Sequence, residues 1–188
     1  MAQDNCFANS LPENLDNCFN DESASGVSLR VQYIPAAFIE SIALPPADGA
    51  MEATVKIAKG GIELAEGKSW KGIDLVMDEN ELKEVLVGGK ANQKGQIEFT
   101  AMIPKFSTKA LGWKRRFANV PLVLNVPDSN GRNWIVGTKF SPAMIESAET
   151  TTGKAYEDKA ATTVVIKANT YVYLYEGDIV ETQDPQAS

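Results

Sequence analysis

Short runs in which apolar and polar side chains alternate recur along this chain, and glycine or proline separates nearly all of them. The clearest run places Val27, Leu29, Val31 and Tyr33 at alternate positions. Because successive side chains of a β-strand point to opposite faces, a period of two predicts a strand with one buried face. Similar runs follow at about 37–44, 53–58, 70–77, 96–103, 121–126, 133–139, 143–150, 162–167 and 170–176. Roughly ten strands at this spacing predict a mainly β fold, an antiparallel β-sandwich or partial barrel.

Turn signals place the connections between these strands. The Asn-Gly pair within 128–131 predicts a hairpin, because such pairs adopt the positive φ angles that a tight turn between twisted strands requires. Residues 45–69 contain two prolines in a row and several glycines, and they predict a long exposed hairpin. Residues 78–86 fit either a short helix with a capping box or a strand, and the pattern leaves both open.

One helix is expected to flank the strands, at about 107–119. Ser107 or Thr108 can cap its N-terminus, and the segment ends before Pro121. Apolar residues recur at helical spacing and predict a stripe that packs on the sheet: Ala110, Trp113 and Phe117. The same geometry leaves three basic residues mostly on the outer side: Lys114, Arg115 and Arg116.

Charge divides the chain into an N-terminal polar arm (1–26), a single β-rich domain (27–176) and an acidic C-terminal tail (177–188). The formal net charge is −7, and this argues against a protein that grips a phosphate backbone over a broad basic face. Basic residues concentrate in 90–116, between the acidic ends. Such a distribution either attracts other copies of the chain or simply solvates the surface, and both interpretations stay open.

The absence of histidine excludes several kinds of chemistry. Ser-His-Asp and Cys-His catalysis, histidine metal ligands and a histidine pH switch all need that side chain. The segment 61–69 resembles a phosphate-binding P-loop, but five residues rather than four separate its glycines, and Glu63 and Glu66 would repel phosphate. We therefore expect no catalytic activity, no metal and no cofactor.

The two cysteines, Cys6 and Cys18, each lie in an Asp-Asn-Cys-Phe repeat near the N-terminus. In a reducing compartment they are expected to be free thiols, and an N-terminal disulfide is the alternative. The polar, acidic N-terminus differs from a secretory signal, and no apolar run approaches the roughly 20 residues that cross a bilayer. The chain is therefore expected to stay in a cytoplasm, without membrane contact, until it is assembled or released.

Two groups of residues are candidates for a subunit interface. The first comprises the helix residues Lys114, Arg115 and Arg116. The second comprises Tyr171, Tyr173 and Tyr175, which alternate along one face of a late strand. Rigid aromatic residues are enriched where proteins meet proteins, although such tyrosines also line the rim of a core.

The order of several segments carries a resemblance to a known family. These segments are 111–119 on the helix, the strand 122–126, the Asn130-Gly131 hairpin, 134–137, 143–147 leading into 150–154, and Asp16-Asn17-Cys18 followed by Gly26-Val27. Together they resemble the tail tube-like virion proteins of tailed phages and prophages, particularly those infecting Bacteroidetes.

The resemblance implies a β-sandwich subunit that assembles as hexameric rings whose inner sheets close into a continuous tube. Rings would stack head to tail, a long hairpin of one reaching the next, around an acidic channel for DNA ejection. It implies synthesis in the host cytoplasm, a place in the virion tail, and three partners: further copies of the chain, other tail proteins and, transiently, phage DNA. The alternatives are another virion component (a tail terminator or head-tail connector) or a non-catalytic β-sandwich binding module, whose exposed tryptophans would come from Trp70, Trp113 and Trp134.

Overall fold

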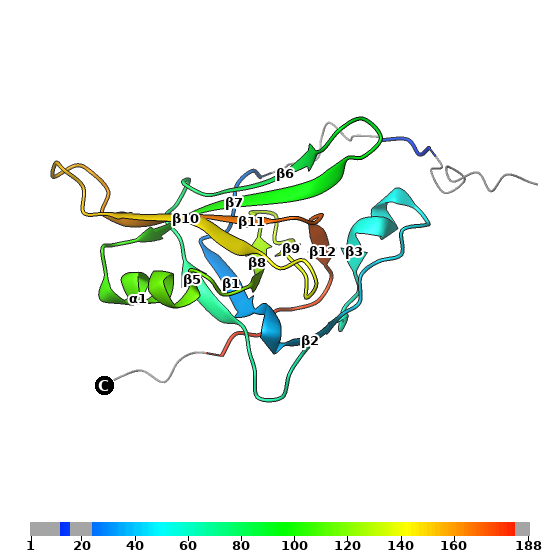
Figure 1. Ribbon diagram of the computed structural model, residues 1–188, viewed down its shortest axis with the longest axis horizontal. Coiled ribbons are helices and arrows are strands. Elements are labelled where there is room, and N and C mark those ends of the chain that lie inside the picture. The colour runs from blue at the N-terminus through cyan, green and yellow to red at the C-terminus, as the bar shows by residue number, and fades with distance from the viewer. Residues whose placement is uncertain (1–11, 16–23, 183–188) are drawn as a thin grey trace, which may run out of the picture.

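The computed structural model describes residues 12–15 and 24–182, and over these residues the protein is mainly β (Figure 1). Its strands form three sheets that are mostly antiparallel. None of the three sheets closes on itself, so the described part of the chain forms layers of open sheets. The predicted fold class, mainly β and antiparallel with one flanking helix, is confirmed.

The largest sheet has six strands in the order β3-β12-β9-β8-β1-β5. Its strands are β1 (Arg30–Pro35), β3 (Lys56–Ile57), β5 (Lys71–Asp74), β8 (Leu122–Pro127), β9 (Asn133–Val136) and β12 (Tyr173–Tyr175). All neighbours pair antiparallel except β3 and β12, which are parallel. Strands from the beginning, the middle and the end of the chain therefore lie side by side in one sheet.

A four-stranded sheet packs on one face of the six-stranded sheet, and a two-stranded ribbon covers part of the other. The four-stranded sheet has the order β10-β11-β7-β6 and is wholly antiparallel. Its strands are β6 (Glu81–Val87), β7 (Lys94–Pro104), β10 (Met144–Thr151) and β11 (Ala161–Ala168). The ribbon pairs β2 (Ile39–Ile42) with β4 (Ile62–Leu64), and two short 3₁₀ helices, Ala36–Phe38 and Met51–Val55, complete the connections.

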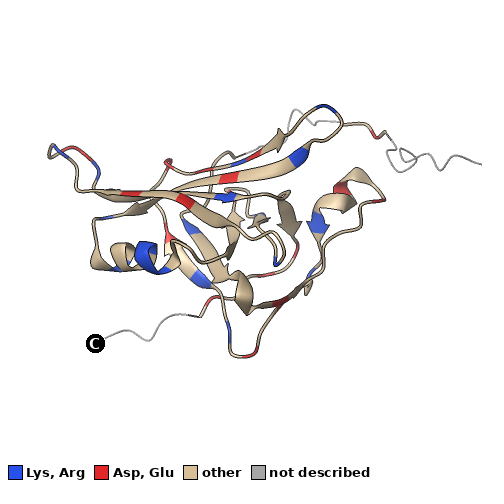
Figure 2. Cartoon of the chain, in the orientation of Figure 1, with Lys and Arg blue, Asp and Glu red and all other residues tan. Residues whose placement is uncertain are grey.

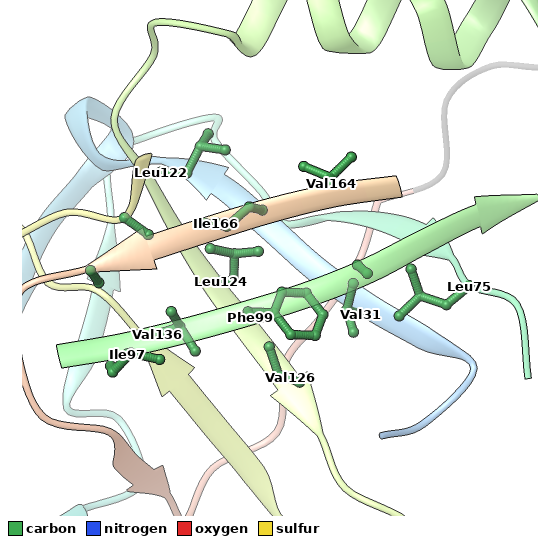
Figure 3. Close-up of a cluster of buried hydrophobic side chains, with 13 residues drawn as sticks. Val31, Leu75, Ile97, Phe99, Leu122, Leu124, Val126, Val136, Val164 and Ile166 are labelled. Atoms are coloured by element: carbon green, nitrogen blue, oxygen red, sulfur yellow. The ribbon is translucent and has the colours of Figure 1, made fainter. Parts of the chain in front are cut away.

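Two hydrophobic cores hold these layers together. In the larger core, Phe99 from β7 and Ile166 from β11 face Leu124 from β8 and Val31 from β1 (Figure 3). The smaller core lies on the opposite face of the six-stranded sheet and contains Ile34, Ile39, Ile57, Trp70, Val123, Ile135 and Tyr175. Strand β8 is buried on both faces because it contributes to both cores, and this explains its unbroken apolar run.

The helix α1 (Thr108–Phe117) lies below the four-stranded sheet in the view of Figure 1. Ser107 is the N-cap, since its hydroxyl accepts a hydrogen bond from the backbone N–H of Ala110 at 3.1 Å. Trp113 and Phe117 pack against the larger core, and both meet the ring of Tyr33 edge to face. The predicted helix and its apolar stripe are confirmed, and the choice of cap is resolved in favour of Ser107.

Three local predictions have different outcomes. Residues 81–87, for which helix and strand were both open, form strand β6. The 128–131 hairpin between β8 and β9 is confirmed, but the positive φ occurs at Gly131 alone, at 78°, and not at Asn130. The prediction of a long exposed hairpin at 45–69 is confirmed at its ends, where β2 and β4 pair antiparallel and most residues are exposed. It is wrong in its centre, because Ile57 is fully buried and β3 pairs with β12.

Candidate assembly surface

The four-stranded sheet presents two open edges. Its first strand, β10, and its last, β6, each pair on one side only with a described strand. All residues of β6 except Leu82 are exposed, and the exposed apolar ones are Val85, Leu86 and Val87. Unpaired backbone N–H and C=O groups at a strand edge are a ready template for a further strand. These two edges are therefore the places where this sheet can be extended by another chain.

A row of alternating charges crosses the outer face of this sheet. Lys83 on β6 lies 3.8 Å from the Glu98 carboxylate on β7. Lys167 on β11 lies 3.2 Å from the other oxygen of Glu98 and 2.6 Å from the Glu146 carboxylate on β10. The bonds to Glu146 and then Glu98 raise the pKa of Lys167 above its usual value. The row therefore reads base, acid, base, acid from one open edge to the other.

A bulge in β10 helps to place the last member of this row. The pairing of β10 with β11 shifts between Ile145 and Ser147, so Glu146 is an extra residue opposite the partner strand. Because a bulge interrupts the strict alternation of side chains, it re-aims a side chain at that point of the strand. The Glu146 carboxylate reaches Lys167 in this arrangement. Sequence reasoning missed the row, because which residues lie opposite each other depends on strand order and register.

The outer face of the sheet otherwise mixes polar and apolar side chains and is nearly neutral. The register places polar or charged side chains beside the row (Glu81, Lys94, Gln96, Thr100, Thr163, Ser147 and Glu149) together with apolar ones (Val85, Val87, Met102 and Val165). Acids and bases on this face are nearly equal in number, and many of them pair with each other. The face therefore offers no concentrated positive charge for binding a phosphate backbone.

The structure separates the three basic residues of α1. Lys114 is half-buried, and its ammonium donates a hydrogen bond to the Thr150 hydroxyl on β10 at 2.9 Å. Arg115 and Arg116 are exposed, as expected. Figure 2 shows this basic segment at the end of the helix, below the sheet. Their role at a subunit interface stays a prediction, with Arg115 and Arg116 as the accessible members.

The basic segment 90–116 does not form one patch. Lys90 and Lys94 lie at the start of β7, whereas the bases from Lys105 onward follow its end. A strand rises about 3.3 Å per residue, so the 11 residues of β7 separate the two groups by roughly 30 Å. A single basic belt, which the linear sequence suggests, is therefore divided in space.

The three tyrosines occupy different environments. Tyr175 is only 8% exposed and belongs to the smaller core, and Tyr173 packs against that core. Tyr171 is 43% exposed and precedes β12. Its ring lies over Gly95, where an added Cβ would be 2.5 Å from the ring carbon Cδ1. Of the predicted tyrosine interface, Tyr171 is thus the member with a substantially accessible ring, and its role at an interface is untested.

The described part of the C-terminal tail, 177–182, contacts its own protomer. The Arg30 guanidinium donates to the Glu181 carboxylate from both Nε and Nη2, with distances between 2.6 and 3.0 Å. Glu181 also accepts a bond from the Gln32 side chain at 3.0 Å. The bond from Arg30 is the main reason that the pKa of Glu181 is lowered. This part of the tail is therefore bound to β1 of its own protomer.

The connection between β10 and β11, residues 152–160, projects beyond the sheet at the left of Figure 1. Tyr156 near its tip is fully exposed. Asp158 orders the loop, because its carboxylate accepts hydrogen bonds from the backbone N–H groups of Lys154 and Ala155 at 2.7 and 2.8 Å. Those bonds lower the pKa of Asp158. This connection is therefore a projecting, exposed hairpin of the described chain.

The three tryptophans do not form an exposed platform. Trp70 is buried in the smaller core, and Trp113 packs between Tyr33 and Phe117. Trp134 lies on the wall of an open cleft of about 540 Å³, between β6 and the β8–β9 hairpin. Its indole N–H donates to Asp128 at 3.0 Å. Burial raises the pKa of Asp128, but this bond and those from the backbone N–H groups of Arg132 and Asn130 outweigh it and lower the pKa.

Among the described residues, no three histidine, cysteine, aspartate or glutamate side chains gather as a metal site would require. No helix in this part of the chain has the length and apolar character needed to cross a membrane. Cys6 and Cys18 lie outside the described residues, so their pairing stays a prediction.

Comparison with known proteins adds no relative: no family model, no curated protein and no solved structure matches this chain.

Proposed function

We propose that this protein is a structural subunit of a phage tail tube or a tail tube-like particle, and that it works without catalysis. One observation carries the proposal: a four-stranded antiparallel sheet whose two edge strands, β6 and β10, are open in the described protomer. A closed ring of copies covers every such edge, and this removes the risk of uncontrolled pairing. The sequence resemblance to tail tube-like virion proteins supports the same assignment.

The outer face of the four-stranded sheet is suited to line the channel of such a ring. Its charges are mixed and largely paired, so DNA would find no row of free bases to bind. In this arrangement the DNA contacts are transient and independent of sequence. The other partners are further copies of the chain and other tail proteins, and the place of action is the virion tail.

The projecting hairpin 152–160 is the element that we assign to stacking of one ring on the next. It extends past the sheet (Figure 1), and its Tyr156 side chain has no cover within the described protomer. Exposed aromatic residues on rigid loops supply contact area at little cost in side-chain entropy. Arg115 and Arg116 offer charge for a second contact between subunits.

The test is the assembly state of the purified full chain. Size-exclusion chromatography with light scattering gives the mass of the particle, and negative-stain electron microscopy gives its shape. Hexameric rings that stack into tubes support a tail tube, whereas single rings that never stack favour a terminator or connector. A monodisperse monomer at all concentrations would overturn the proposal and favour a binding module that uses the cleft beside Trp134.

A further inference from the structure

Asn130 and Gly131 form the only Asn-Gly pair in the sequence, and they lie in the turn between β8 and β9. Both residues are exposed. A Cβ added at Gly131 would meet no atom within 4 Å, so nothing crowds the backbone on that side of the turn. Because glycine has no Cβ, its backbone nitrogen is the one least shielded from the side chain that precedes it. The pair therefore has the arrangement in which an asparagine amide reacts with the backbone of its own chain.

This reaction is deamidation, and water is the only co-reactant that it needs. The Gly131 nitrogen loses its proton and bonds to Cγ of Asn130, and the side-chain nitrogen leaves as ammonia. Water then opens one of the two C–N bonds that close the resulting five-membered imide, and the product is aspartate or isoaspartate. The chain gains one negative charge, and no group is oxidised or reduced.

The backbone of Ala24 holds the Asn130 amide. The amide oxygen accepts a hydrogen bond from the Ala24 N–H at 3.0 Å, and the amide nitrogen donates one to the Ala24 carbonyl at 2.8 Å. The side chain must rotate to bring Cγ to the Gly131 nitrogen, and its own nitrogen then leaves, so these bonds have to break first. The Gly131 N–H also donates to the Asp128 carbonyl at 3.1 Å, and that bond is lost in the same step.

Ala24 is the outermost residue of a segment that lies along the β8–β9 hairpin. Further in, Ser129 N–H donates to the Gly26 carbonyl at 3.1 Å, and Ser28 N–H donates to the Pro127 carbonyl at 2.8 Å. These bonds involve neither atom of the Asn130 amide. Ala24 can therefore detach while Ser28 stays in place and the hairpin stays folded.

The product of the reaction cannot restore the contact. A carboxylate has no N–H to donate to the Ala24 carbonyl, and its negative charge repels that oxygen. Isoaspartate in addition lengthens the backbone by one atom within a tight turn. Detachment of Ala24 that is followed by reaction is thus irreversible.

We propose that Asn130 is a deamidation site whose reaction is controlled by the segment that begins at Ala24. While Ala24 is bound the amide is protected, and once Ala24 has detached Asn130 reacts and the attachment is lost. Gly26 and Val27 of the same segment line the cleft beside Trp134, so the reaction loosens one wall of that cleft. The control acts within one protomer and is independent of the proposed function.

The test compares Ala24→Pro with Ala24→Ser in the folded full chain. Proline removes the N–H that binds Asn130, whereas serine keeps both backbone groups. The proteins are incubated in heavy-oxygen water, and peptide mass spectrometry measures the conversion of Asn130. Ala24→Pro should react about five times faster than the wild type, the factor that corresponds to one net hydrogen bond of about 1 kcal/mol. Ala24→Ser should react at the wild-type rate, and equal rates for the two variants would overturn control by Ala24.

Two other asparagines serve as internal controls in the same digests. Asn92 and Asn169 are exposed, but Gln93 and Thr170 follow them. They should keep their amides while Asn130 reacts, and conversion of all three at one rate would overturn the assignment of the site. Slow hydrogen exchange of the Ser28 N–H in Ala24→Pro checks that the hairpin is still folded, and loss of this protection would contradict local detachment.

A last measurement tests the loss of the attachment. Anion exchange separates converted from unconverted wild-type protein, because the product carries one more negative charge. Residues 24–26 should exchange their amide hydrogens faster in the converted protein, and Asn92→Asp, which adds the same charge elsewhere, should leave that exchange unchanged. Equal exchange in the converted and unconverted proteins would overturn the irreversible release.

Discussion

Arg30 and Glu181 join the two ends of the described chain. Two nitrogens of the guanidinium contact the Glu181 carboxylate, and a third nitrogen bonds Asp74 on β5 at 2.5 Å. Gly72 leaves room for this contact, because a Cβ there would collide with the guanidinium. The tail segment is thus held against β1 and β5 by charge and by an isolated β-bridge between Glu181 and Trp70, without a continuous strand.

We expect Glu181→Gln to destabilise the protein by about 1 kcal/mol, because it weakens charged hydrogen bonds at a largely covered carboxylate. For a chain of this size the loss corresponds to a decrease in Tm of roughly 2–4 °C. Asp178→Asn is the matched control, since Asp178 is highly exposed and its 3.3 Å pair with Lys59 contributes little. Equal changes in Tm for the two variants, measured by circular dichroism, would refute the role of the Arg30 contact.

Stability should decrease at both extremes of pH and stay nearly level between them. The lowered pKa values of Glu181 and Asp128 mean that these groups stabilise the fold above the ordinary carboxyl pKa, about 4. Their contribution is lost as the pH falls through the lowered values. The raised pKa of Lys167 gives a contribution that is present below about 10.4 and lost above it. Because the chain has no histidine, a step in Tm between about pH 6 and 7.5 would contradict this account.

Ile57→Ala should destabilise the protein by about 2–5 kcal/mol, because the side chain is fully buried in the smaller core. Val55→Ala, two residues earlier, should change stability by less than about 0.5 kcal/mol, since Val55 is 40% exposed. Urea unfolding measures both. Similar small losses for the two variants would restore the interpretation of 45–69 as a loop outside the core, and deletion of 47–67 would then leave the fold intact.

Reversal of the exposed helix charges, Arg115→Glu with Arg116→Glu, should weaken assembly and change its dependence on salt. Attraction between exposed charges is screened over about 8–10 Å at ordinary ionic strength. Light scattering from 50 to 500 mM salt follows the effect, with Lys90→Glu at the other end of β7 as the control. If assembly is unchanged across this range, these arginines do not lie in the interface.

Shortening of the projecting hairpin, by joining Gly153 directly to Lys159, should leave the fold and the single ring intact but stop the rings from stacking. The removed residues are exposed and make no contact with either core. Tyr156→Ser should shorten tubes in the same way, and Tyr156→Phe should not. Tubes of normal length in electron micrographs of the shortened variant would show that the stacking contact lies outside this hairpin.

The sequence predicted the strands and the helix well where a local pattern decides the structure. Alternation identified β1, β7 and β11, and the Ser107 cap with the Trp113 and Phe117 stripe identified α1. It was less informative at β8, whose continuous apolar run reflects burial on both faces. It also failed in the centre of 45–69, because Ile57 is buried in a core that it shares with Trp70 and Tyr175, and no local pattern shows that these segments meet.

The candidate assembly surface could be predicted only in part. Arg115 and Arg116 are exposed because helical geometry places them opposite the apolar stripe. The ion row from Lys83 to Glu146 depends on the order β10-β11-β7-β6 and on a bulge, and neither is encoded by periodicity. The alternation of tyrosines was visible in the sequence, but burial of Tyr175 follows from the pairing of β12 with β3 and β9.

The position of β12 has a consequence for how the protein folds as it is made. This strand is the last of the described strands, yet it lies inside the six-stranded sheet between β3 and β9. A ribosome delivers β3 long before its parallel partner exists, so the central sheet cannot be completed until β12 has been synthesised. Folding that waits for pairing between distant segments is slow, in the millisecond-to-second range. A nascent chain that lacks β12 therefore leaves β3 and β9 without the strand that joins them.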